Sequence, residues 1–258
     1  MHIRVINPVI TTSWERETLE AYQAAADPDT EVSVVTLDWG TPSIEGHVAE
    51  ALVAPDIIAK AIEAERAGVD AVVVDCMGDP GVQACREAVA IPVVGPAEAC
   101  MHLAAILGHR FSVLTVVDSL IPIVENQALR YGVAAKLASV RAFNIPVLDL
   151  ASDAGATLGA VVAVAEAAVR SDGAHVLIPG CTGLAGFAPR IQAELAARGC
   201  EVPVLDPPPV AMKLAQSLVA LGYHHSRRTY GRPSVAGHRW PVALPFDFVT
   251  VPEPTPVL

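Results

Sequence analysis

The sequence predicts an α/β protein of two lobes, each with a parallel sheet covered by helices, with a cleft between the lobes. Short Val- and Ile-rich runs alternate with longer Ala-, Glu- and Leu-rich stretches along most of the chain. Most of the short runs are almost continuously apolar, which is typical of strands buried on both faces of a parallel sheet. The alternation starts again near residue 111. We therefore predict that the architecture of the first lobe is repeated in the second.

The first lobe is predicted to contain residues 1–98 together with residues 206–225. Its first strand is a short apolar run that ends at Asn7, before a loop that carries Thr12. Its longest helix has apolar residues at helical spacing and is closed by Gly68, because glycine readily takes the left-handed conformation found at helix ends. The expected strands are residues 3–7, 31–37, 71–75 and 91–95, and the expected helices are residues 14–26, 48–67, 81–88 and 211–221.

The second lobe is predicted to contain residues 99–205 and to show the same alternation. Asn7 and Cys76 are 69 positions apart, and Thr115 and Cys181 are 66 positions apart, which supports a shared layout without a clear residue-level repeat. The expected strands are residues 111–117, 138–144, 174–179 and 202–206, and the expected helices are residues 121–131, 158–171 and 185–198.

The segment 226–258 is predicted to be an extended arm that lies on a surface, either of this chain or of a neighbouring subunit. It is rich in proline, and its aromatic residues are scattered: Tyr230, Trp240, Phe246 and Phe248. The arm and the hydrophobic fraction of 52% lead us to expect a homo-oligomer.

Charge and composition exclude several classes of partner. The formal net charge is −11, from 17 basic and 28 acidic residues, and the longest basic cluster is Arg227-Arg228. We therefore expect neither nucleic acid nor an anionic membrane surface as a partner. The first residues indicate a strand rather than a signal peptide, and no apolar stretch is a convincing membrane span. Five cysteines without paired short spacings argue against a disulfide framework, so the cytoplasm is the expected compartment.

Two cysteines occupy matching positions in the two lobes. Cys76 and Cys181 each follow an apolar strand and precede a glycine turn and a helix. Ligands of open α/β sheets bind at this edge, where helix N-termini favour anions such as thiolates. Two thiols on opposite sides of one small molecule can remove a proton from a carbon and return one to its other face. The pair therefore predicts a racemase, although a single cysteine after a strand is more often a small core residue.

Polar groups near the two cysteines are candidates for binding the substrate. The negative charge that develops on the substrate needs oriented donors, which main-chain N–H groups and the side chains of Asn7, Thr115 and Thr182 can supply. Gly78 and Gly183 would let the main chain approach the ligand closely. Asn7 and Thr182 can equally serve a turn and a helix cap.

Other polar residues have weaker claims to the site. Asp79 is expected first to cap a helix and only second to contact a ligand. No cofactor is expected, because the three lysines lie in helix-like or surface contexts that do not suit a pyridoxal Schiff base. No metal is expected, because His47 and His102 have no second ligand residue at metal spacing.

Several short motifs follow one another in a characteristic order. They are Asn7-Pro8 with Thr11-Thr12, Ser43-Ile44-Glu45, Asp-Cys-Met-Gly-Asp-Pro-Gly at 75–81, Ile-Pro-Val-Val-Gly at 91–95, Phe-Ser-Val-Leu-Thr at 111–115 and Gly-Cys-Thr-Gly at 180–183. Together they resemble the aspartate/glutamate/hydantoin racemase superfamily, and within it the hydantoin racemase branch, over residues 3–230. The resemblance implies two flavodoxin-like lobes related by a pseudo-twofold axis, racemisation or epimerisation without a cofactor, and Cys76 and Cys181 as the catalytic pair. Thr12, in the first motif, joins the candidate substrate-binding residues.

Three functions are compatible with these residues. The first is racemisation of a 5-substituted hydantoin or related cyclic amide, whose C5 proton is more acidic than that of a free amino acid. The second keeps the scaffold but is an amino-acid racemase of the Asp/Glu type, or a lyase or decarboxylase that uses one cysteine. The third is a non-catalytic accessory protein for metalloenzyme maturation, because Asp75-Cys-Met resembles a sub-branch labelled hydrogenase expression protein, whereas hydantoin racemases more often have Ala-Cys-Phe. The thiol pair and the lack of a Cys-x-x-Cys spacing argue against this third function.

Overall fold

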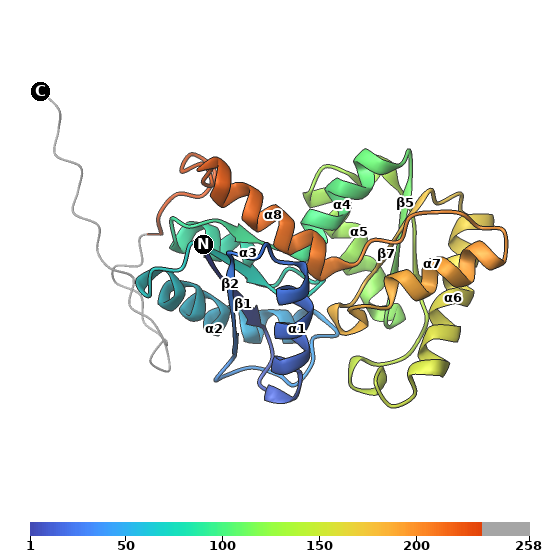
Figure 1. Cartoon of the computed structure of the whole chain (residues 1–258), viewed down its shortest axis with the longest axis horizontal. Coiled ribbons are helices and arrows are strands. Elements are labelled where there is room, and N and C mark those ends of the chain that lie inside the picture. The colour runs from blue at the N-terminus through green and yellow to red at the C-terminus, as the bar shows by residue number, and fades with distance from the viewer. Residues whose placement is uncertain (234–258) are drawn as a thin grey trace, which may run out of the picture.

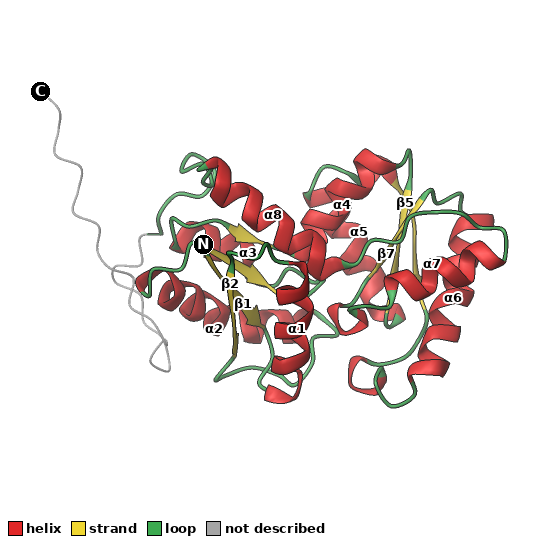
Figure 2. Ribbon diagram, in the orientation of Figure 1, coloured by secondary structure: helices red, strands yellow, loops and turns green. Residues whose placement is uncertain are grey.

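The computed structural model describes residues 1–233, which form two α/β lobes side by side (Figure 1). Each lobe has a parallel sheet with helices on both faces, so each lobe is three layers deep (Figure 2). This arrangement confirms the predicted fold class. Within residues 1–233, no helix is both long and apolar enough to cross a membrane.

The first lobe is built on a four-stranded sheet with the strand order β2-β1-β3-β4. The strands are β1 (His2–Asn7), β2 (Glu31–Thr36), β3 (Ala71–Val74) and β4 (Val93–Val94). One face is covered by α2 (His47–Arg66) and α3 (Val82–Ala88), and the other by α1 (Glu15–Ala25) and α8 (Pro207–Leu221).

Side chains alternate between these two faces along β3 and beyond its end. Val74 packs in the cluster under α2 and α3, whereas Val73 packs in the cluster under α1 and α8. The next two residues continue the alternation, because Asp75 is hydrogen-bonded to Tyr22 of α1 while Cys76 packs against the α2/α3 cluster. The side chains of neighbouring residues at this strand end therefore lie on opposite sides of the sheet.

The second lobe repeats the arrangement with the strand order β6-β5-β7. Val204 forms an isolated parallel bridge to Leu177 of β7, in the place that β4 takes beside β3 in the first lobe. The strands are β5 (Phe111–Thr115), β6 (Leu137–Ala142) and β7 (Val176–Pro179). One face is covered by α6 (Ala154–Arg170) and α7 (Ala188–Ala197), and the other by α4 (Pro96–Leu107) and α5 (Ile121–Arg130).

Helix α4 lies between the lobes, against α8 (Figure 1). No element is predicted for residues 96–107, and the predicted lobe boundary between residues 98 and 99 falls inside this helix. Met101 packs into the core of the second lobe, whereas Ala99 packs with α8 in the core of the first. The division of the chain at residue 98 stays a prediction, but α4 contributes to both cores.

Two helices begin one turn earlier than predicted. Helix α8 begins with Pro207, Pro208 and Pro209, which are tolerated because the N–H groups of a first turn have no partner within the helix. Helix α6 begins at Ala154, where Asp153 accepts hydrogen bonds from the N–H groups of residues 155 and 156 at 3.0 and 2.9 Å. Proline and glycine disfavour the interior of a helix, so the prolines and glycines in these segments made both predicted starts too late.

The described part of the predicted arm, residues 226–233, lies on the first lobe. Arg227 donates to the carbonyls of Arg86 and Val89, and the Tyr230 hydroxyl accepts a hydrogen bond from Arg86 at 3.2 Å. The rest of the predicted arm, with Trp240, Phe246 and Phe248, lies outside the described residues.

Candidate active site

The carboxyl ends of both sheets face one cavity of about 780 Å³. This volume falls in the range of roughly 300–1,000 Å³ common to small-molecule sites. The first lobe contributes Asn7 and Cys76, and the second contributes Thr115 and Cys181. The predicted cleft is thus present, and both cysteines line it.

The same short turn holds each sulfur atom. The Gly78 N–H donates a hydrogen bond to Cys76 Sγ at 3.3 Å, and the N–H of Gly183, which stands in the equivalent position after Cys181, lowers the pKa of the Cys181 thiol. A β-carbon placed on Gly78 would lie 3.5 Å from Cys76 Sγ, and one on Gly183 would lie 3.4 Å from Cys181 Sγ. The two thiols therefore have closely similar surroundings in the two lobes.

Burial disfavours the thiolate form of both cysteines. It raises the pKa of Cys181 to about 12 and raises the pKa of Cys76 well above its ordinary value. The glycine N–H groups lower each pKa in part, whereas the nearby Asp75 carboxylate raises both. Both cysteines are therefore neutral thiols at neutral pH.

Two buried polar side chains, each with one unpaired atom among the described residues, stand at matching strand ends. Asn7, which is 3% exposed, accepts a hydrogen bond from the Thr18 hydroxyl on Oδ1 at 3.2 Å, and its Nδ2 has no partner among the described residues. Thr115 is fully buried, and its Oγ1 likewise has no partner within residues 1–233. Both residues line the cavity, so each has an atom free to bond a ligand.

Thr182 links the two lobes beside the thiols. Its hydroxyl donates to the main-chain carbonyl of Asp75 at 3.2 Å, and Asp75 Oδ1 accepts from the Tyr22 hydroxyl at 2.8 Å. Burial raises the pKa of Asp75 to about 6, although the Tyr22 hydrogen bond opposes this rise. Asp75 therefore connects directly to Cys76 along the chain and to the Cys181 turn through Thr182.

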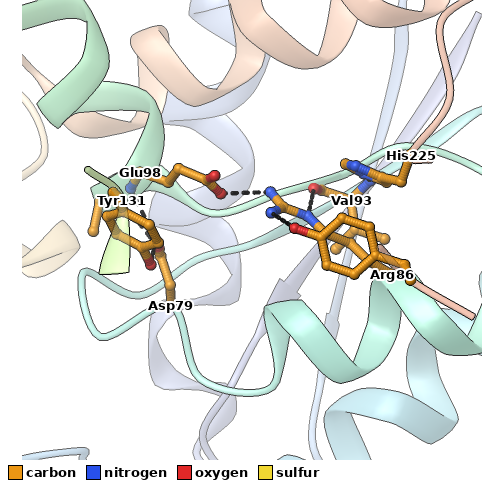
Figure 3. Close-up of polar contacts among 8 residues, drawn as sticks. Asp79, Arg86, Val93, Glu98, Tyr131 and His225 are labelled. Carbon is orange, nitrogen blue, oxygen red and sulfur yellow. Dashed lines mark hydrogen bonds and ion pairs between the residues drawn. The ribbon is translucent and has the colours of Figure 1, made fainter. Parts of the chain in front are cut away.

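Asp79 and Thr12 do not line the cavity. The Asp79 carboxylate caps α4 by accepting from the N–H groups of Ala97 and Glu98 at 3.0 and 2.8 Å, and it also accepts from the Tyr131 hydroxyl at 2.7 Å. Figure 3 shows this contact, with Arg86 bonded to Glu98 beside it. Thr12 is exposed in a short 3-10 turn. Asp79 therefore caps a helix, as expected first, and the substrate contacts predicted for Asp79 and Thr12 stay predictions.

The sequence reasoning missed Gln127 and the acidic character of the cavity. Gln127 lines the cavity from the middle of α5, and no motif surrounds it. Five carboxylates line the cavity, while none of the described lining residues is Lys, Arg or His; the carboxylates belong to Glu17, Glu20, Glu50, Asp75 and Asp206. In the sequence these carboxylates are visible only as acidic residues in helices α1 and α2 and at strand ends. A count of charges does not show that they share one site.

Known proteins match the chain over nearly its whole described length. Residues 3–215 match the family model described as Asp/Glu/Hydantoin racemase. The chain belongs to this family. Within residues 1–233, no group of three His, Cys, Asp or Glu side chains is arranged to hold a metal ion.

Individual members of this racemase family are similar to the chain over most of its length. The chain is 35% identical to the hydantoin racemase of Rhizobium meliloti over 93% of this chain and 99% of the relative. It is 36% identical to the hydantoin racemase of Pseudomonas sp. (strain NS671) over 90% of this chain and 92% of the relative. The allantoin racemase structure from Klebsiella pneumoniae has a TM-score of 0.86 and 34% identity, covering 93% of this chain and 97% of that one. The chain is accordingly an isomerase of the racemase type, which confirms the predicted enzyme class.

Proposed function

We propose that this chain racemises a 5-substituted hydantoin or a related cyclic amide, with Cys76 and Cys181 as its two proton-transfer groups. The observation that carries the proposal is the presentation of two thiols, by equivalent turns of the two lobes, to one cavity. The names of the relatives agree with this substrate class, because allantoin is itself a hydantoin with a ureido group on C5.

The reaction moves one proton onto sulfur and another off sulfur. The thiolate of one cysteine removes the C5 proton, and the C–H electron pair delocalises into the adjacent ring carbonyl. The neutral thiol of the other cysteine then gives its proton to the opposite face of C5. The negative charge ends on the second sulfur, and the enzyme in that form is ready for the opposite enantiomer.

The buried environment suits this chemistry. A thiolate whose pKa is raised is a stronger base, which better matches the weakly acidic C5–H bond. The raised pKa also keeps the second cysteine protonated and able to donate. One neutral and one ionised thiol together form the reactive state.

Developing negative charge on the substrate carbonyl needs donors that are already in place. We assign this role to Asn7 Nδ2 and to the Thr115 hydroxyl, because both are buried, line the cavity and have no protein partner among the described residues. Thr182, Gly78 and Gly183 belong to the same predicted substrate-binding set, and all three line the cavity.

The charge of the cavity favours a neutral substrate over an acidic amino acid. Five carboxylates and no basic side chain surround the space among the described lining residues. An acidic amino acid carries two carboxylates and one ammonium group, so it is a net anion at neutral pH and would be repelled there. A hydantoin ring is uncharged at neutral pH and offers both N–H donors and carbonyl acceptors.

Proton exchange in deuterium oxide tests this function. Single enantiomers of 5-substituted hydantoins, aspartate and glutamate are followed by NMR and polarimetry with wild type, Cys76→Ser and Cys181→Ser. We expect deuterium at C5 and loss of optical rotation with hydantoins only. The rate of racemisation is expected to fall by about 10²–10⁴-fold in either variant. Cys200→Ser is the control, because Cys200 is buried in the second lobe away from the cavity. Activity on the amino acids, or on no compound, would contradict the proposal.

We further infer a homo-oligomer located in the cytoplasm. Apolar side chains remain exposed on α4 and α5, where Ile106 is 80% and Leu129 is 66% exposed. All five cysteines, which lie within residues 1–233, are free, as suits a reducing compartment. Light scattering coupled to size-exclusion chromatography would contradict the oligomer if the full chain eluted with the mass of a monomer.

A further inference from the structure

Gln127 joins α5 of the second lobe to the turn that carries Cys76 in the first. Its Nε2 donates a hydrogen bond to the main-chain carbonyl of Met77 at 3.0 Å. The side chain is 2% exposed. Met77 follows Cys76 directly, so this contact places Gln127 at the catalytic turn.

The Met77 bond fixes which end of the amide is free. A carbonyl oxygen accepts only from the NH₂ end of a glutamine, so Oε1 must face the other way. That oxygen is buried, and it has no donor among residues 1–233. A buried acceptor without a donor is unfavourable, and at the edge of a cavity a ligand N–H can satisfy it.

The position of Gln127 distinguishes it from a second glutamine with the same bonding. Gln216 on α8 is 4% exposed, donates through Nε2 to Thr30 at 2.7 Å and also has an unpaired buried Oε1. Gln216 does not line the cavity, whereas Gln127 does, together with its helix neighbours Ile123 and Val124. Gln127 therefore differs from Gln216 in its position in the cavity wall beside the Cys76 turn, and not in its unpaired amide oxygen.

Resting on the function proposed above, we propose that Gln127 is a specificity-determining residue whose Oε1 accepts a hydrogen bond from a ring N–H of the substrate. The substrate class is then narrowed to cyclic amides in which that nitrogen carries hydrogen. A substrate alkylated on this nitrogen would leave Oε1 unpaired and would bring an alkyl group against it. The Met77 carbonyl holds the amide in the orientation that this recognition needs.

N-methylation of the substrate tests the assignment. The parent hydantoin and its N1-methyl and N3-methyl analogues are compared by kcat/KM for wild type, Gln127→Met and the matched control Gln216→Met. We expect wild type and Gln216→Met to discriminate against one of the two methylated analogues by on the order of tenfold to a hundredfold. Gln127→Met is expected to reduce that ratio to within a few-fold of one, because the methionine side chain accepts hydrogen bonds only weakly.

A purely structural role would lower kcat/KM for all three compounds equally and leave the ratio unchanged, which would overturn the assignment. Equal turnover of all three compounds by wild type would also overturn it. If Gln127→Met does not fold, Gln127→Asn keeps an amide but withdraws it by one methylene, and the same ratio is measured. If wild type binds hydantoins without turnover, the proposed racemisation fails, and the ratios of dissociation constants for the three compounds decide the role of Gln127.

Discussion

The surroundings of Cys76 and Cys181 oppose the thiolate form that the proposed proton transfer needs. Burial raises the pKa of both thiols, and the charge of Asp75 raises both further. Asp75 precedes Cys76 in the chain, and its carbonyl accepts from Thr182, which follows Cys181. One carboxyl group therefore influences how readily either sulfur loses its proton.

Replacement of Asp75 tests this influence through the pH dependence of the rate. Because each raised pKa must be overcome to form a thiolate, we expect wild-type kcat/KM to rise with pH beyond neutrality. The pKa of Asp75 is about 6, so its carboxyl is ionised over that pH range. Asp75→Asn removes this charge, and the rise is expected to move to lower pH. Asp56→Asn, a buried carboxyl outside the cavity, serves as control. An Asp75→Asn profile that coincides with wild type would exclude the influence.

The residues of the site that follow strands were predictable, and those on helices were not. Cys76, Cys181, Asn7 and Thr115 all stand at strand ends, where parallel sheets bring residues distant in sequence to one edge. Gln127 reaches the cavity from the middle of a helix. Which face of that helix meets the other lobe depends on tertiary packing that periodicity does not specify.

Helix α4 shows how one element positions the turn that carries Cys76. Asp79, at the end of the turn that begins with Cys76, caps α4 and also holds Tyr131 of the second lobe. Gly95 is the N-cap residue of α4, and a β-carbon there would lie 2.4 Å from Asp79 Cγ. The cap therefore has room for no side chain at residue 95.

Gly95→Ala is expected to lower the free energy of unfolding by about 1–3 kcal/mol, because the added methyl group overlaps the Asp79 carboxyl group. Gly46→Ala is the matched control, since Gly46 is the N-cap residue of α2 and a β-carbon there meets nothing within 4 Å. Urea denaturation followed by circular dichroism gives both values. Equal stability of the two variants would show that Asp79 moves aside without cost.

Most elements were predictable because strands buried on both faces read as apolar runs, as in β3, β5 and β7. Helix α4 was not predicted, and the starts of α6 and α8 were placed late. Helix α4 is apolar on the sides that meet both lobes, so it lacks the polar face that marks a surface helix. Prolines at the start of α8 suggested a loop, although the first turn of a helix accepts them.

At the scale of the whole molecule, the candidate site lies where the two lobes meet. Among residues 1–233, the hydrogen bonds that join them include Thr182 to Asp75, Gln127 to Met77, Tyr131 to Asp79, the Val147 N–H to Glu45, and the Gly186 N–H to Asp206. Three of these end on the short turn 75–79 that carries Cys76. The relative position of the two thiols is therefore fixed by the same contacts that hold the lobes together. Local sequence signals could predict two lobes and a cleft, but not these contacts.

Exchange of the C5 proton, measured separately on each enantiomer of one hydantoin, tests two-thiol proton transfer most directly. Wild type, Cys76→Ser and Cys181→Ser are compared in deuterium oxide. If each thiol serves one face of C5, both variants lose racemisation. Each variant also loses proton exchange on the enantiomer whose proton its missing thiol removes. The two variants therefore exchange the C5 proton of opposite enantiomers. A variant that still racemises both enantiomers would contradict the account, because the reaction would then need only the remaining cysteine.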